Sequence, residues 1–402
     1  MDSRPGSGER IEFPESHPDP LRSPERARDP FAWYDRARRE GPVSYDPQRE
    51  VYDVFSHEHV KAALQDDERL VRKPLARESM ATPNPFSYID NAMVWSDGTT
   101  HGRTKHQLFE YFRPDVLGDL RDGIEAVTEA QLDAALADGR TFDFAAEVAV
   151  PVPLRVVMDL VGVPRKDHRK VLSWLETFRL VMNKEYSAAE SANPDAMTET
   201  VAYFEDLVAE RTTDPREDLV SRLVTGTDLD DATIGANCFD FIMAGQGTMS
   251  EFLSNAVYVF DRDGLFDRLD EYDLDALLEE VLRYRSPLQS RVRETAASVT
   301  LAGVDIPAGE TVVLWLGAAN RDPARYDDPH QFVPDRDPDH LAFGSGTHVC
   351  IGAPLARLEG RVVIETLCRR VNALSVHTDD VRPKPKASKL GFERLPVTAG
   401  SP

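Results

Sequence analysis

The chain has 402 residues, 41% of them hydrophobic, so it is long enough to bury a large core in one large domain or two ordinary ones. Its formal net charge of −23 argues against nucleic acid or an anionic membrane surface as the main partner. The basic residues are 38 Arg and only 9 Lys, and Asp outnumbers Glu by 41 to 29. This bias is typical of proteins adapted to concentrated salt, but an acidic cytosolic protein from a GC-rich genome would also show it, and both interpretations stay open.

The cysteines and the lack of apolar runs bear on the compartment. Cys238, Cys350 and Cys368 form neither an even disulfide framework nor a CxxC pair, which indicates a reducing environment. Residues 1–20 contain no apolar segment of the signal-peptide type, and no run of about 18 apolar residues occurs anywhere. We therefore expect a soluble, cytoplasmic protein.

The N-terminal part of the chain mixes helix and strand signals. Residues 1–28 are rich in Pro, Gly and charge, which predicts a flexible arm before a single domain over residues 29–402. The domain should begin with a helix over 29–42, a strand pair over 43–55 and a helix over 56–64. The stretch 74–95 has no clear period and predicts a long loop, which in a compact chain is usually functional.

The rest of the chain is mostly helical by its pattern. Helical periodicity dominates from residue 97 to about residue 285, and strand signals return over 301–316, with Gly303 and Pro-Ala-Gly as turns. A loop over 320–347 precedes a last long helix over 353–374, and a short strand pair closes the chain. The predicted fold class is mainly α with minor β, a large helical body with small sheets.

The stretch FGSGTHVCIGAPLAR, residues 343–357, places a cysteine in a glycine-rich loop before a helix. Gly344, Gly346 and Gly352 allow a tight turn and a close approach to a large flat group. Cys350 at a helix N-terminus is favoured as a thiolate, which serves either as a nucleophile, with His348 near in sequence, or as a metal ligand. A buried, inert thiol is the third possibility, and the loop alone leaves all three open.

This stretch resembles the haem-binding loop of the cytochrome P450 family in its order Phe, Gly, x, Gly, x, His, x, Cys, x, Gly, followed by Leu-Ala-Arg. The match is long and gapless, and further similar segments extend from about residue 29 to the C-terminus. The resemblance implies that Cys350 is the proximal thiolate ligand of the iron of haem b. It also implies that Phe343 packs beside the haem, that Gly344 and Gly352 border it, and that His348 reaches a propionate.

Two further segments carry the same resemblance. In LLEEVLRYRSP, Glu280 and Arg283 match the family's Glu-x-x-Arg, and Arg336 matches the third member of its buried charge network. Such a network must be fully paired, so these residues should be structural, although an exposed ion pair would show the same spacing. In RETAASVTLAG, Arg293 matches the arginine that binds a propionate. Arg291 could anchor a substrate carboxylate, but the sequence favours a surface residue.

The segment SDGTTHGRTKHQLFEYFRP resembles the family's acidic lead-in to a helix with His and Arg one turn apart. Here the pair is His101 and Lys105. Lysine can meet a propionate as a point charge, but it cannot form the forked contact of arginine.

Residues 231–260 predict a long helix, capped by Asp230 or Asp231, that resembles the distal helix of the family. The resemblance implies a haem buried between this helix and the proximal helix. The family pattern is Ala-Gly-x-acid-Thr, and here it is Ala244, Gly245, Gln246, Gly247 and Thr248. The hydroxyl is present, but the acid that relays protons is replaced by Gly247.

Three hypotheses can account for the missing acid. Water could enter the groove and replace the carboxylate, the substrate could bring its own acid, or the chemistry could need fewer protons. The sequence favours water, with Thr248 as the main proton-delivering side chain, supported by Gln246 or ordered water.

The resemblance therefore implies a haem-thiolate monooxygenase acting on a small, mostly apolar molecule, with electrons from a separate ferredoxin or flavodoxin. No glycine-rich dinucleotide fingerprint follows a strand, so a fused reductase is not expected, and we expect a monomer. The substrate pocket should draw on residues 74–95, 172–195, 244, 288–292 and 390–392. A haem-thiolate peroxygenase, a rearrangement catalyst or a haem sensor without turnover are the alternatives, and a protein without haem is a remote one.

Overall fold

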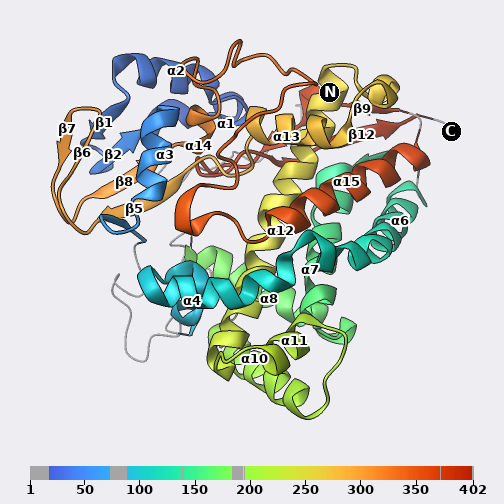
Figure 1. The fold of residues 1–402 in the computed structure, drawn as a ribbon. Coiled ribbons are helices and arrows are strands. Elements are labelled where there is room, and N and C mark those ends of the chain that lie inside the picture. The colour runs from blue at the N-terminus through green and yellow to red at the C-terminus, as the bar shows by residue number, and fades with distance from the viewer. Residues whose placement is uncertain are drawn as a thin grey trace, which may run out of the picture.

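The computed structural model describes residues 18–72, 88–137, 139–182, 193, 195–371 and 373–400. Figure 1 shows a sheet and its short helices on one side, a group of helices on the other, and the long helix α12 between them. The predicted fold class, mainly α with minor β, is confirmed. None of the helices in these ranges combines the length and apolar character needed to cross a bilayer.

The helices of the described ranges vary widely in length. They are α1 (Pro24–Arg28), α2 (Phe31–Glu40), α3 (His57–Gln65), α4 (Gly98–Phe109), α5 (Pro114–Leu117), α6 (Arg121–Ala137), α7 (Pro151–Val161), α8 (His168–Met182), α10 (Ala196–Thr213), α11 (Leu219–Gly226), α12 (Asp231–Arg262), α13 (Leu274–Tyr284), α14 (Leu316–Ala319) and α15 (Ala353–Arg370). The expected helices over 29–42, 56–64, 231–260 and 353–374 therefore correspond to α2, α3, α12 and α15.

The strands of the described residues are short and form four small sheets. They are β1 (Val43–Asp46), β2 (Val51–Val54), β3 (Leu70–Val71), β4 (Thr141–Asp143), β5 (Arg291–Thr295), β6 (Val299–Leu301), β7 (Val304–Ile306), β8 (Thr311–Leu314), β9 (Leu374–Val376), β10 (Arg382–Pro383), β11 (Phe392–Arg394) and β12 (Pro396–Ala399). The largest sheet has the order β1-β2-β8-β5-β3, in which only the β2–β8 pair is parallel.

The predicted arm needs a correction in the part that the structure describes. Residues 1–17 and 73–87 lie outside the described residues. Residues 18–28 pack against the body, because Leu21 is 2% exposed and the carbonyl of Arg28 accepts a hydrogen bond of 3.2 Å from Arg285 Nη2. Pro and charge suggested an arm, but a short helical turn and one buried leucine attach this part of the chain to the domain.

Helix α12 is central to the core. Asp230 caps it, since its side chain accepts a hydrogen bond of 2.8 Å from the N–H of Thr233. The C-terminal half of α12 packs with α6, α7, α13 and α15 in one apolar cluster, and the N-terminal half packs with α8, α10 and α11 in another. Residues 234–242 and 249–257 are buried, whereas residues 243–248 are accessible. We call residues 243–248 the open interval of α12.

Candidate active site

The loop before α15 has a backbone fixed by hydrogen bonds and glycines. The N–H of Cys350 donates to the carbonyl of Phe343 at 2.9 Å, and that of Val349 to Gly346 at 3.1 Å. Gly344 and Gly346 have φ of 77° and 72°, which favours glycine. At Gly346 a Cβ would also lie 2.8 Å from the carbonyl oxygen of Leu64. The glycines therefore let this loop turn tightly against α3, as the sequence predicted.

The thiol of Cys350 is exposed to solvent, yet burial is the largest influence on its pKa and raises it. The two observations agree if the sulfur faces a space inside the molecule, enclosed by protein on its other sides. A hydrogen bond from the Gly352 backbone and the charges of Arg291, Lys105 and Arg357 act in the opposite direction and lower the pKa of the thiol. This setting supplies positive potential to a sulfur that is open on one side, as a metal-binding thiolate requires.

The open interval of α12 lies next to Asp240, which shares the neighbour Arg291 with Cys350. The Thr248 hydroxyl donates to the carbonyl of Ala244 at 2.9 Å, and Gly245 faces α7, where a Cβ would lie in ordinary contact, 3.5 Å from a methyl of Val157. Arg291 lies close enough to both Cys350 and Asp240 of α12 for each negative charge to raise its pKa. Cys350 and the predicted distal helix are therefore brought to one site.

Three arginines gather at one edge of this site, where the charge of Asp97 raises the pKa of two of them, Arg72 and Arg293. Burial and the charges of Arg291 and Arg293 lower the pKa of Arg72 to about 9, and burial and Arg291 lower that of Arg293 to about 10. The nearby carboxyl group of Asp240 has its pKa raised to about 7 by burial, so it carries only part of a negative charge at neutral pH. Mutually repelling, buried guanidinium groups of this kind need an anionic ligand.

Two of these arginines differ from the sequence-based expectation. Arg291 was favoured as a surface residue, but it is half-buried and its pKa is lowered by burial. Arg72 was not predicted at all. It follows β3, whose antiparallel pairing with β5 places Val71 opposite Glu294, next to Arg293.

The predicted propionate residues on α4 contact the cysteine loop. Lys105 Nζ donates to the carbonyls of Thr347 at 2.6 Å and Val349 at 2.8 Å, and His101 Nε2 lies 3.1 Å from the Thr347 oxygen. The His101 and His348 rings are 4.0 Å apart. The structure therefore brings both histidines and the lysine together, but the lysine is engaged by loop carbonyls.

A carboxylate contacts His348, and a guanidinium group contacts the ring of Phe343. His348 Nε2 lies 2.7 Å from Asp97 Oδ1, and the guanidinium of Arg357 lies 4.7 Å from the centre of the Phe343 ring. Both side chains are thus positioned on the loop of Cys350.

The charge network expected of Glu280, Arg283 and Arg336 is confirmed. Arg283 donates to both carboxylate oxygens of Glu280 at 2.7 Å, and Arg336 Nε donates to Oε1 at 3.2 Å. The side chains of Glu280 and Arg283 are both 0% exposed. The network is structural and holds the chain segment that leads to the cysteine loop.

Gly247 lies beside a lysine that the sequence did not place near it. A Cβ at Gly247 would be 2.6 Å from Lys389 Nζ. Gln246 and Gly247 are half-buried in the open interval of α12. Lys389 adjoins the predicted pocket residues 390–392, whereas residues 183–192, in the predicted pocket region 172–195, lie outside the described residues.

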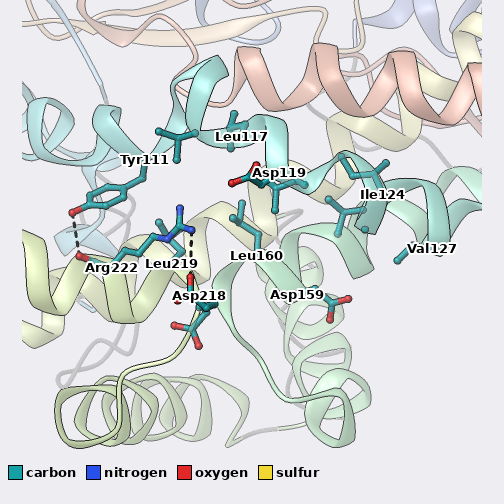
Figure 2. Close-up of a pocket in the computed structure, with 15 residues that line it drawn as sticks. Tyr111, Leu117, Asp119, Ile124, Val127, Asp159, Leu160, Asp218, Leu219 and Arg222 are labelled. Carbon is teal, nitrogen blue, oxygen red and sulfur yellow. Dashed lines mark hydrogen bonds and ion pairs between the residues drawn. The ribbon is translucent and has the colours of Figure 1, made fainter.

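A cavity of about 160 Å³ lies apart from this site, between α5 and α6 on one side and α7 and α11 on the other (Figure 2). At one end the Tyr111 hydroxyl donates to the carbonyl of Arg222 at 3.1 Å. Its lining residues include none from α12 or from the loop of Cys350. We therefore do not assign the cavity to the catalytic site.

The residues of the site fit an iron porphyrin with two carboxylates. An accessible cysteine in a tight loop, an accessible interval on α12, and a cluster of three arginines match the needs of the iron, the flat ring and the propionates.

Comparisons with known proteins agree with this fit. The family profile described as Cytochrome P450 matches residues 273–399. The erythromycin C-12 hydroxylase of Saccharopolyspora erythraea is 34% identical over 386 residues, which are 92% of this chain and 94% of that protein. Cytochrome P450 119 of Sulfolobus acidocaldarius is 31% identical over 380 residues, which are 91% of this chain and 98% of that protein.

Solved structures show the same likeness. Substrate-free CYP109E1 from Bacillus megaterium superimposes with a TM-score of 0.85 at 29% identity, covering 92% of this chain and 98% of that one. P450BioI in complex with an acyl carrier protein carrying hexadec-9Z-enoic acid also gives 0.85 at 29% identity, covering 94% of this chain and 100% of that one. A halophilic origin receives no support from these relatives. The chain belongs to the cytochrome P450 family, in its bacterial type, and is a cytochrome P450 monooxygenase.

Proposed function

We propose that this monooxygenase binds haem b through Cys350 and inserts one oxygen atom from dioxygen into a small, mostly apolar organic substrate. The observation that carries the proposal is Cys350 itself, an exposed cysteine whose thiol is influenced by a backbone hydrogen bond from Gly352 and by the charges of Arg291, Lys105 and Arg357. Haem, when bound, supplies the binding and activation of dioxygen, and an anionic sulfur ligand favours cleavage of the O–O bond.

The residues around Cys350 would hold and orient the cofactor. Arg72, Arg291 and Arg293 supply the positive charge for its carboxylates, with His101 and His348 beside them. Phe343, Gly344 and Gly352 shape the proximal side, and Ala244 and Gly245 leave the distal side open. Lys105 would act mainly by fixing the loop carbonyls, and its charge also favours the thiolate.

Proton delivery rests on Thr248 in this proposal. Its hydroxyl donates a hydrogen bond to the Ala244 carbonyl. The hydroxyl oxygen can therefore accept a hydrogen bond from a water or a substrate group. Gly247 carries no titratable group, and water beside Gln246 would complete the path.

Electrons would come from a separate ferredoxin- or flavodoxin-type donor. The sequence contains no glycine-rich dinucleotide fingerprint, and the relatives are bacterial-type enzymes of the same length class. We further propose a cytoplasmic monomer with a single domain that includes residues 18–28.

A peroxygenase is the second candidate, and Gly247 is the observation that favours it, because the family's acid is missing from the distal helix. Turnover with hydrogen peroxide, together with none from dioxygen and a reductant, would select this candidate.

The first test is the spectrum of the dithionite-reduced, carbon monoxide-bound protein. We expect the strongly red-shifted Soret band of a thiolate ligand in the wild type and in C368S, and its loss in C350S. Cys368 is the matched control, since it is a partly buried cysteine on α15, outside the loop. A red-shifted band that persists in C350S, or is absent from the wild type, would overturn the assignment.

A further inference from the structure

A turn near the C-terminus is fixed against α12. A Cβ at Gly391 would lie 2.5 Å from Glu251 Cγ, and Asn255 Nδ2 donates to the carbonyl of Leu390 at 2.8 Å. On its other side the turn is tied to the segment before β5, since the N–H of Leu390 donates to Pro287 at 2.9 Å. We call residues 384–391 the lysine turn, because it carries Lys384 and Lys389 on a backbone fixed on two sides.

Both of these lysines approach the same buried carboxylate. Lys384 Nζ donates to Glu251 Oε1 at 2.7 Å, and Lys389 Nζ lies 3.5 Å from Oε2. The Glu251 side chain is 0% exposed. Within the described ranges Glu251 Oε2 accepts no hydrogen bond. Two ammonium groups and one carboxylate leave one positive charge uncompensated, and Lys389 is the partner that is less firmly bound.

The ammonium group of Lys389 lies beside the open interval of α12. Its Nζ lies 2.6 Å from the point where a Cβ at position 247 would stand. Gly247 directly precedes Thr248 in the chain. The Lys389 side chain is 26% exposed, so it is neither sealed in the core nor fully solvated. A partly desolvated ammonium group attracts an anion more strongly than a fully solvated surface lysine does.

We propose that Lys389 is a substrate-binding residue that holds a carboxylate group of the substrate beside Gly247 and Thr248. The proposal rests on the proposed function, since it places this carboxylate in the substrate space of a monooxygenase. Gly247 leaves room beside the ammonium group that a side chain at this position would share with it. The substrate carboxylate then lies where the family pattern has an acid of the enzyme.

Calorimetric titration of the haem-loaded protein tests the proposal. The probes are octanoate, dodecanoate and hexadecanoate, each against the 1-alkanol of the same chain length. We expect at least one acid to bind about tenfold or more tightly than its alcohol, as for a hydrogen-bonded charge pair. K389M should remove this preference without changing the affinity for the alcohol, and K389R should restore it. K61M is the matched control, because Lys61 lies on α3 and pairs with Asp339 at 3.1 Å.

Two results would overturn the proposal. One is that no acid of any length binds more tightly than its alcohol in the wild type. The other is that K389M weakens acid and alcohol equally, which would indicate a packing role. The reduced, carbon monoxide-bound spectrum of the same samples separates this failure from a failure of the proposed function, since a red-shifted Soret band shows that the haem-thiolate assignment holds whatever the titrations give.

Discussion

The substitution E280Q would test how far the buried charge network supports the haem site. Glu280 and Arg283 lie one turn apart on α13, and neither side chain is exposed to solvent. The remaining N–H groups of Arg283 donate at 2.9–3.0 Å to the carbonyls of Asn320, Pro329 and Gln331. One guanidinium therefore binds a helix to the irregular segment that leads to the loop of Cys350.

The expected loss of stability follows from the position of the charge. Glutamine keeps the size of the side chain at position 280, but it leaves the charge of Arg283 buried without a carboxylate. Stranding one partner of a buried ion pair costs about 3–5 kcal/mol. The N–H of Val333, which donates to Glu280 Oε1 at 3.0 Å, also loses a charged acceptor. We therefore expect a large fall in the urea midpoint, together with a reduced haem-to-protein ratio.

The assay is urea unfolding followed by tryptophan fluorescence, with E271Q as the control. Arg268 and Glu271 have the same spacing and a similar distance of 2.6 Å, but both side chains are about half exposed. We expect E271Q to be indistinguishable from the wild type, since solvent screens this pair. E280M/R283M should be more stable than E280Q, because the fully buried charge of Arg283 is removed and only the partly exposed Arg336 loses its carboxylate. Equal midpoints for E280Q and E271Q would refute the argument from burial.

Three further predictions concern a carboxyl group and two glycines. Burial raises the pKa of Glu359 to about 8, so the folded state holds a proton that the unfolded state releases near pH 4.5. Stability should therefore fall as pH rises between these values. The fall in urea midpoint from pH 6 to pH 9 should be smaller in E359Q than in the wild type. G346A should lower haem content and urea midpoint more than G344A does. Both glycines have a positive φ, but only at position 346 would a Cβ meet the backbone of α3. Equal losses in the two variants would indicate backbone strain alone. G247E should pair with Lys389 and so weaken dodecanoate binding, measured by calorimetry. If position 247 limits proton delivery, G247E should also lower the fraction of electrons lost as peroxide. An unchanged fraction would contradict that role of position 247.

The parts of the site that the sequence predicted are encoded locally. The loop of Cys350 is recognisable because its glycines and its cysteine must stand at fixed spacing in one short segment. Helix α12 is recognisable from its length, its cap and its apolar period. Glu280 and Arg283 lie on one helical face, so their pairing also follows from spacing, although their complete burial does not.

The parts that the sequence missed depend on contacts between distant segments. Arg72 joins the site through β3, a two-residue strand that carries no periodic signal and is defined only by its pairing with β5. The lysine turn meets Glu251 across more than a hundred residues of chain. The position of Arg291 differs from the prediction for a related reason, because the sequence of a short strand does not show which of its side chains other segments cover.

Positive charges of this acidic protein lie where its proposed ligands would bind. The net charge of −23 is spread over a protein whose site is rich in cations, with three arginines in one cluster and three of the nine lysines on one turn, two of which approach Glu251 of α12. Burial and mutual repulsion of the arginines disfavour the folded protein without a ligand, since each lowered pKa records an unfavourable charged state. A dianionic cofactor relieves that repulsion, so haem binding and folding should be coupled, with the haem-free protein unfolding at lower urea. The positive charge at Lys389 is separate from this cluster, and it remains available to an anionic substrate after the cofactor has bound.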